Sequence, residues 1–454
     1  MNAEPSAGAL ESLRLYTRPR MLSMLALGLS SGLPFMLIFS TLSAWLSQVG
    51  IKRATVGMLA WVSLAYSFKF LWSPIVDRVT LPLAGKRLGQ RRSWMLLAQL
   101  SCAAALFSIS VSDPRNHITH VALLALWLAF SAATQDIAID AWRIESAPVR
   151  EQGAMAAAYQ LGYRLAILVG SAGALWLAAD AGWGFCYATM AALIGVGVLT
   201  TLLVREPERV APRESLLAQQ RVIDWLASRG HWPGWLRRAG GWVFAAVICP
   251  VLDFFTRFGL ALGLLVFAFI STYRLTDFTM GTMANRFYLD LGFSLREIAA
   301  VAKIFGTAWT IAGILFGGFA VARLGRVRSL LLGSALVMIS NIGYSILAAH
   351  GEPSVPGLAT VISLDNFAQG VHGTALIAFL SSLTSAAFTA TQYAVLSSLY
   401  SLLPKLLMGT SGLVVDAIGY PPFYLYTASL SIPALLLLYV LSRRRDFRAL
   451  VSRV

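Results

Sequence analysis

Acidic side chains occur within stretches of the sequence that are otherwise strongly apolar. Asp136 and Asp140 lie four residues apart, and therefore on one face of a helix. Asp277 and Asp365 lie in two further apolar stretches. Burying an ionisable group in a membrane costs about 2.5–3.5 kcal/mol on insertion scales, so such groups indicate a function. A desolvated carboxylate can bind and release a proton near neutral pH, so these four residues are candidates for proton coupling.

These carboxylates differ in whether a basic residue lies near them in the sequence. Arg274 precedes Asp277 by three residues and is placed to pair with it on the same helix face. A carboxylate without a cationic partner is the better proton carrier, which favours Asp136 and Asp140 over Asp277. The alternative for each of these ionisable residues is an internal ion pair that holds two helices together.

A second group of residues could bind a solute. Arg164 shares a helix face with Gln160 and lies beside Tyr159 and Tyr163. Tyrosine rings stack on the apolar face of a sugar, and arginine forms forked hydrogen bonds with a carboxylate. This lining suits a polar, anionic, sugar- or peptide-like solute. The other candidate binding residues are Gly32, Gln135, Arg274, Asn285, Lys303, Asn366 and Gln392.

Two features of helix geometry also bear on the site. The run Ser30-Ser31-Gly32-Leu33-Pro34 predicts a kink, which either frees carbonyl groups for a substrate or serves helix packing. Lys69 and Arg286 lie near expected helix ends, where we expect their side chains to extend towards the membrane surface.

The sequence offers little for catalysis or for a cofactor. The three cysteines, Cys102, Cys186 and Cys249, have no metal-ligand spacing, and the five histidines are scattered. No Gly-x-x-x-x-Gly-Lys-Ser/Thr pattern is present to hold nucleotide phosphates. We therefore expect no metal, no cofactor and no enzyme activity. A membrane-bound acyl or glycosyl transferase is the alternative from a different class.

These residues must be positioned by membrane-spanning helices. The chain has 454 residues, of which 57% are hydrophobic and 13% charged, whereas soluble domains carry roughly 25% charged residues. Its mean hydropathy is +0.69. About 20 apolar residues cross the hydrocarbon core, and twelve ranges qualify: 21–45, 54–75, 94–112, 118–141, 153–178, 183–204, 259–288, 296–322, 327–349, 354–381, 385–417 and 422–442. We interpret 242–257 as an interfacial segment.

The basic residues predict the orientation. If the N-terminus lies inside, 26 of the 36 Lys and Arg residues, Arg143 among them, fall in cytoplasmic segments and 4 on the other side. This asymmetry predicts a multi-pass protein with both termini in the cytoplasm. The net charge of +15 is then a topology signal rather than a sign of nucleic-acid binding.

The two halves of the chain have similar sequence motifs at equivalent positions. The sequence Gly89-Gln90-Arg91-Arg92-Ser93 opens the third expected helix, and Gly325-Arg326-Val327-Arg328-Ser329 opens the ninth. The polar interval 205–241 separates the halves, so we expect six-helix bundles at 1–204 and 259–454. A cytoplasmic linker with amphipathic or interfacial helices would occupy 205–258. Six-helix repeats around a central site are a transporter architecture.

The loop after the second expected helix carries Asp77-Arg78 and a basic cluster, and a related segment runs from Gly317 to Arg328. This pattern resembles the loop motif of the major facilitator transporters, in which helices 1, 4, 7 and 10 line the cavity. We expect Asp77 to pair with basic residues across the cytoplasmic seam and to latch the halves. Asp77, Arg78 and Arg326 are thus the candidate gating residues; the alternative is ordinary positive-inside charge.

Longer segments resemble the AmpG-type muropeptide permeases of that superfamily. They include Ser30–Phe35, Tyr66–Pro74, Ala133–Ala141, Tyr273–Asp277, Phe287–Phe293 and Ala390–Ala394, and His372 departs from the family pattern. The resemblance implies import of anhydro-muropeptides across the bacterial inner membrane, driven by protons, for cell-wall recycling. We expect a monomer whose partners are the substrate, protons and the bilayer. The alternative is transport of another bulky anionic solute, such as an acetyl-CoA-like compound, a peptide or a nucleotide conjugate.

Overall fold

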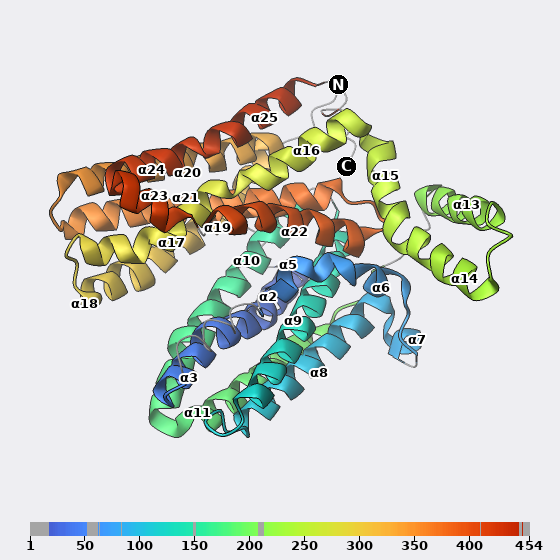
Figure 1. Cartoon of the computed structure of the whole chain (residues 1–454), viewed down its shortest axis with the longest axis horizontal. Helices are drawn as coiled ribbons and strands as arrows, with labels where there is room; N and C mark the ends of the chain where they lie inside the picture. Colours follow the sequence, from blue (N-terminus) through green and yellow to red (C-terminus); the bar gives the residue numbers. More distant parts are fainter. Residues whose placement is uncertain are drawn as a thin grey trace.

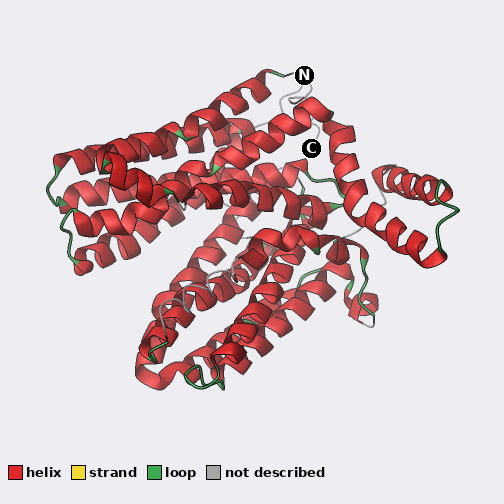
Figure 2. Cartoon of the chain, viewed as in Figure 1, coloured by secondary structure: helices red, strands yellow, loops and turns green. Residues whose placement is uncertain are grey.

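The computed structural model describes residues 18–51, 62, 64–82, 84–148, 151–207, 213–408, 410–444 and 447. Within these ranges all regular secondary structure is helical, and short loops join the helices (Figure 2). Two bundles of long helices meet beside the linker and diverge away from it (Figure 1). We call the part of the molecule where the bundles meet the linker the linker end.

The first bundle is built from the helices that precede the linker. These are α2 (Pro19–Met36), η1 (Leu37–Thr41), α3 (Leu42–Gln48), α5 (Leu64–Phe68), η3 (Lys69–Leu71), α6 (Ser73–Arg78), α7 (Ala84–Leu88), α8 (Gln90–Ser110), α9 (Ile118–Ser146), α10 (Gln152–Leu168), η5 (Val169–Gly173), α11 (Ala174–Leu193) and α12 (Gly195–Leu203).

The linker forms a helical hairpin that projects from the bundles (Figure 1). It consists of α13 (Arg213–Ala227), α14 (Gly234–Val243), the π-helical turn η6 (Phe244–Ile248) and α15 (Cys249–Phe258). The segment 242–257, expected at the interface, lies within the 25-residue helical run Gly234–Phe258, which is long and apolar enough to cross a membrane. Its interfacial placement stays a prediction.

The second bundle follows the linker. Its helices are α16 (Leu260–Tyr273), α17 (Leu275–Asp290), α18 (Leu295–Ile298), η7 (Ala299–Phe305), α19 (Gly306–Leu324), α20 (Arg326–His350), α21 (Val355–Leu383), α22 (Thr389–Met408), α23 (Ser411–Ile418), α24 (Tyr420–Ser429) and α25 (Ser431–Arg443).

The helices match the expected membrane spans. Ten helical runs of described residues are long and apolar enough to cross a membrane. One of them, Gln152–Leu203, has 52 residues and contains Gly182 at a non-helical φ of 84°, so it comprises two crossings rather than one. Each of the twelve expected ranges contains described helix, although the range 54–75 is described only at residue 62 and from residue 64.

Glycines allow the helices within a bundle to approach closely. A Cβ on Gly162 of α10 would lie 1.9 Å from the carbonyl oxygen of Leu25 in α2, and one on Gly28 would lie 2.3 Å from that of Tyr159. In the second bundle, a Cβ on Gly313 of α19 would lie 2.1 Å from the carbonyl oxygen of Phe367. Because these neighbours are backbone atoms, they cannot rotate away. The helix pairs α2–α10 and α19–α21 therefore pack backbone to backbone.

We expect Gly162→Ala to destabilise the first bundle. The added methyl group meets the backbone of α2, so the two helices must separate, at a cost of about 1–3 kcal/mol or more. The control is Gly195→Ala, where an added Cβ has no neighbour within 4 Å. The melting temperature of the detergent-purified protein should fall for Gly162→Ala and stay the same or rise for Gly195→Ala. Equal melting temperatures would contradict the proposed packing.

Candidate functional site

A cavity of about 380 Å³ lies between the two bundles. It receives side chains from both halves of the chain, and rings, hydroxyls and charged groups dominate its surface. Its lining residues are Phe35, Tyr66, Lys69, Asp136, Asp140, Tyr159, Gln160, Tyr163, Arg164, Ile167, Arg274, Phe278, Ile377, Tyr393, Ser397, Tyr400, Ser401 and Lys405. An aromatic lining with a few convergent polar groups is typical of small-molecule sites.

The cations of the cavity differ in their partners. Lys69 Nζ lies 3.7 Å from Asp140 Oδ2, and Lys405 Nζ donates to Ser67 Oγ at 2.5 Å. Arg274 Nε lies 3.0 Å from Asp277 Oδ2. Arg164, in contrast, has no hydrogen bond or ion pair with any described residue. Its guanidinium is therefore available to an anionic group that enters the cavity.

Asp136 and Asp140 line the same cavity in different environments. Ser31 donates a hydrogen bond to Asp136 Oδ1, and the Ser31 and Tyr159 hydroxyl oxygens are 2.8 Å apart. Among the described residues no cation lies within ion-pair distance of Asp136. Asp140 is paired with Lys69 and, at 3.4 Å, with Arg143. Of the two carboxylates that the sequence favours equally, Asp136 is the one without a cation within ion-pair distance among the described residues.

The position of Arg143 in the structure differs from the one that the sequence predicts. The sequence places it in a cytoplasmic segment, beyond a helix expected to end at residue 141. In the structure α9 continues to Ser146, and Arg143 is fully buried. Its Nη1 donates to Ser381 Oγ of α21 at 2.8 Å, and its guanidinium lies 5.2 Å from the centre of the Tyr393 ring. Arg143 therefore joins the two halves of the chain beside the cavity.

The second bundle holds its own buried polar cluster. The Asp277 carboxylate forms hydrogen bonds with His372 Nδ1 and with Gln369 Nε2, each at 3.0 Å. It also forms the ion pair with Arg274. Asp365 accepts from Ser340 Oγ at 3.1 Å and, within the described part of the chain, pairs with no cation. Asp277 and Asp365 lie outside the cavity lining.

The two halves use the same spacing for these groups. In α9 the residues at positions i, i+4 and i+7 are Asp136, Asp140 and Arg143, and in α21 they are Asp365, Gln369 and His372. In both halves the first position is a carboxylate without a cationic partner among the described residues. The internal repeat thus extends to the buried polar side chains, which a comparison of loop motifs alone does not reveal.

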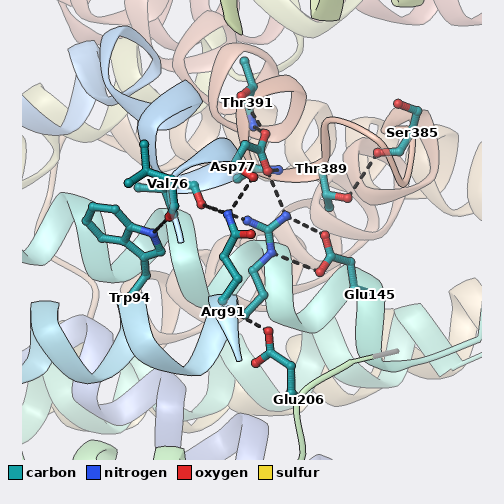
Figure 3. A network of polar contacts seen from close by, with 12 residues as sticks. Val76, Asp77, Arg91, Trp94, Glu145, Glu206, Ser385, Thr389 and Thr391 are labelled. Atoms are coloured by element: carbon teal, nitrogen blue, oxygen red, sulfur yellow. Dashed lines mark hydrogen bonds and ion pairs between the residues drawn. The ribbon is translucent and has the colours of Figure 1, made fainter. Parts of the chain in front are cut away.

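Asp77 lies near the end of α6 and contacts the opposite half of the chain at the linker end (Figure 3). Its carboxylate accepts the backbone N–H of Ala390 at 3.1 Å and of Thr391 at 2.6 Å, and the Thr391 hydroxyl at 2.6 Å. These donors belong to the first turn of α22, whose free N–H groups attract negative charge. Asp77 thus caps a helix of the opposite half. The expectation that it pairs with basic residues across the seam was wrong: its partners there are backbone groups and a hydroxyl.

The cation that pairs with Asp77 comes from its own half (Figure 3). Arg91 Nη2 lies 2.8 Å from Asp77 Oδ1 and 2.6 Å from Glu145 Oε1. The Glu206 carboxylate accepts the backbone N–H of Arg91 and of Arg92 at the start of α8. Arg91 therefore holds the Asp77 carboxylate in position, and this ion pair is buried rather than solvated.

The linker also takes part in the contacts at this end of the molecule. Arg78 donates to the backbone carbonyl of Ala245 in η6. On the other side, Gln392 Nε2 donates to the Pro250 carbonyl at 2.9 Å and to Asp253 Oδ2 at 2.8 Å, and its Oε1 accepts from Arg257 at 2.9 Å. Both ends of the Gln392 amide are thus occupied at the linker, away from the cavity lining where the sequence suggested a substrate contact.

Several other predicted residues lie at helix contacts. A Cβ on Gly32 would lie 2.8 Å from Ala166 Cβ in α10. Gln135 donates to Ser30 Oγ at 3.1 Å, and Asn366 accepts from Thr310 Oγ1 at 2.8 Å. Pro34 lies inside α2, and the carbonyls of Leu33 and Pro34 accept the N–H of Leu37, so the helix continues into η1 beyond the proline. None of these belongs to the described cavity lining.

Two predicted residues are placed only by their backbone. Asn285 lies in α17 and Lys303 in η7, but their side chains fall outside the described part of the structure. Arg326 is the first residue of α20 and is half-buried. In the described ranges no group of three or more His, Cys, Asp or Glu side chains could hold a metal ion.

Sequence reasoning missed the role of Lys69 in the cavity lining and of Ser31, which contacts two lining residues. Lys69, expected to extend to the membrane surface, is buried and pairs with Asp140. Ser31 was noted only as part of a kink, yet it bonds both Asp136 and Tyr159. The signal for Lys69 was its distance from the end of the apolar run, since it precedes Asp77 by eight positions.

The comparisons with known proteins agree over nearly the whole chain. The profile of the Major Facilitator Superfamily matches residues 21–404. The anhydromuropeptide permease of Escherichia coli strain K12 is 35% identical over 438 residues, which cover 96% of this chain and 82% of that protein. A protein of Rickettsia conorii named as an AmpG transporter is 32% identical, covering 95% of this chain and 98% of that protein.

The fold is similar to that of a solved transporter. A structure of the proton:xylose symporter XylE bound to 6-bromo-6-deoxy-D-glucose superposes with a TM-score of 0.63, over 93% of this chain and 94% of that one. The sequence identity is 13%, so this likeness bears on the fold alone.

Proposed function

This chain belongs to the Major Facilitator Superfamily, within its AmpG-type branch, and we propose that it imports anhydro-muropeptides in symport with protons. The observation that carries the proposal is one cavity between the bundles that contains both Arg164 and Asp136, each without an oppositely charged partner among the described residues. The first suits an anionic substrate, and the second suits a proton.

The direction of transport depends on which end of the molecule faces the cytoplasm. We take the linker end as cytoplasmic, because arginines are concentrated in the linker and in the loops at that end. The protein then lies in the bacterial inner membrane with both termini in the cytoplasm. The segments 1–204 and 259–454 are the bodies that rock about the cavity, and 205–258 connects them. The seal at Asp77 closes the cytoplasmic path in this conformation.

The cavity chemistry suits a sugar-peptide. The rings of Tyr159 and Tyr163 lie 6.1 Å apart at a tilt of 49°, and they offer apolar faces to a sugar. The hydroxyl of Tyr66 is buried without a hydrogen-bond partner among the described residues, so a substrate hydroxyl could satisfy it. Arg164 and Arg274 supply positive charge from opposite halves of the chain, which suits a carboxylate of a stem peptide.

The decisive experiment is uptake of radiolabelled anhydro-muropeptide by proteoliposomes, with and without an imposed inward proton gradient. Accumulation that depends on the gradient supports both the substrate and the coupling. Uptake that merely equilibrates supports the substrate and contradicts symport. If the same folded preparation transports another anionic solute but no muropeptide, the substrate assignment is wrong and the transporter fold stands.

We expect Arg164→Gln to weaken substrate binding selectively. A charge-assisted hydrogen bond contributes about 1.5–3 kcal/mol, so the KM for a substrate with peptide carboxylates should rise roughly tenfold or more. The peptide-free disaccharide with its lactyl carboxylate converted to the amide carries no negative charge, so it serves as the internal control and should lose much less. Competition uptake with both ligands measures the difference. An equal loss for both ligands would show that Arg164 only maintains the cavity.

A further inference from the structure

The linker hairpin carries concentrated positive charge. Residues 220–248 contain four arginines, Arg221, Arg229, Arg237 and Arg238, but only one acidic residue, Asp224. In the described structure none of these four arginines forms an ion pair. The hairpin therefore presents a basic surface whose charge the protein itself does not neutralise.

Two of these arginines border a cavity. A space of about 570 Å³ lies between α13 and the α14–η6 helix, and Arg237 and Arg238 line it. Val222, Leu226 and Trp242 form an apolar wall of the same cavity. Charge at one side and apolar surface at the other match a molecule with an anionic head and a hydrocarbon tail.

The position of the hairpin indicates which kind of amphipathic molecule would fit this cavity. Trp235 and Trp242 of α14 are 69% and 43% exposed, and Val247 and Val251 continue the apolar stripe along η6 and α15. The stripe runs on to the exposed Leu260 and Leu264 of α16, a membrane helix. Tryptophan at the end of an apolar surface is typical of the interface between lipid headgroups and hydrocarbon.

We propose that the linker hairpin binds the headgroup of an anionic phospholipid between Arg237 and Arg238, with an acyl chain against Val222, Leu226 and Trp242. This site is separate from the transport cavity and does not depend on the transported substrate. Charge complementarity and continuity with the lipid-facing surface of α16 both favour a lipid over a soluble partner.

Native mass spectrometry of the detergent-purified protein, titrated with phosphatidylglycerol and with phosphatidylcholine, tests the site. We expect phosphatidylglycerol to bind more tightly than phosphatidylcholine. The double variant Arg237→Gln/Arg238→Gln should lose about thirtyfold in affinity for phosphatidylglycerol, since each basic residue near an anionic surface contributes about 1 kcal/mol. Its melting temperature should match that of the unaltered protein, because neither side chain is buried.

The control removes the same charge elsewhere. Arg443→Gln/Arg444→Gln alters an exposed basic pair at the end of α25, and the phosphatidylglycerol affinity should change less than twofold. Trp242→Ser should weaken lipid binding while leaving the headgroup contacts intact. Equal losses in both double variants would mean that only diffuse charge matters, which would overturn the site. Displacement of the lipid by an equal concentration of inorganic phosphate would likewise overturn the assignment to a lipid.

Discussion

Asp136→Asn will abolish gradient-driven accumulation of substrate while leaving exchange of substrate across the membrane. Asparagine has the shape of aspartate, and it can still accept the Ser31 hydrogen bond, so the cavity keeps its form. It cannot take up a proton, however, and so the proton gradient can no longer drive the cycle. Accumulation should fall to the level of simple equilibration, whereas counterflow of labelled against unlabelled substrate should persist.

Two further variants make this result specific. Asp113→Asn removes one carboxylate from an exposed loop outside the cavity and should leave accumulation unchanged. Asp140→Asn leaves the buried Arg143 without its acidic partner, so it should impair counterflow as well as accumulation. If Asp136→Asn accumulates substrate normally, the proton must use another group, and Asp365, at the equivalent position of the second half, is the next to test.

Asp77→Asn will open the linker end. The variant loses the negative charge that accepts hydrogen bonds from two backbone N–H groups and a hydroxyl and that pairs with Arg91. The NH2 group of the new asparagine would also face these hydrogen-bond donors. The three bonds to Ala390 and Thr391 cross between the halves, and a hydrogen bond to a charged group contributes about 1.5–3 kcal/mol. The equilibrium between closed and open conformations should therefore shift by a hundredfold or more towards opening.

Distances between spin labels can measure this shift. Labels at Arg87 and Arg328, which are exposed on opposite halves, should move apart in Asp77→Asn in a background without the three native cysteines. Asp224→Asn, which removes a linker charge without touching the seal, is the control and should not change the distance. Thr391→Ala keeps the backbone N–H and loses one hydroxyl contact, so its effect should be several times smaller. An unchanged distance in Asp77→Asn would refute the seal.

The sequence predicts the fold and the chemistry of the cavity better than the contacts between distant helices. Composition and apolar runs predict the helices, and the cost of burying charge identifies Asp136, Asp140 and Arg164, all of which line the cavity. The local spacing of Arg274 and Asp277 also predicts their ion pair correctly.

The errors arise where tertiary structure decides. Arg143 was placed outside a helix because hydropathy falls there, yet a carboxylate one turn away and Ser381 from the other half keep it buried. Gln392, a candidate binding residue, lies in a stretch that resembles the AmpG-type permeases, and only the folded chain shows the linker groups that occupy it. The partners of Asp77 in the other half are more than 300 positions away, and two of its bonds go to backbone groups that have no sequence signature.

The use of backbone donors at the seal has an evolutionary consequence. Any residue except proline presents the same N–H group, so positions 390 and 391 can vary without removing those two hydrogen bonds. Asp77 has no such freedom, because the carboxylate itself provides the contact. Related chains should therefore vary far more at positions 390 and 391 than at position 77. Most substitutions at position 77 should weaken the barrier.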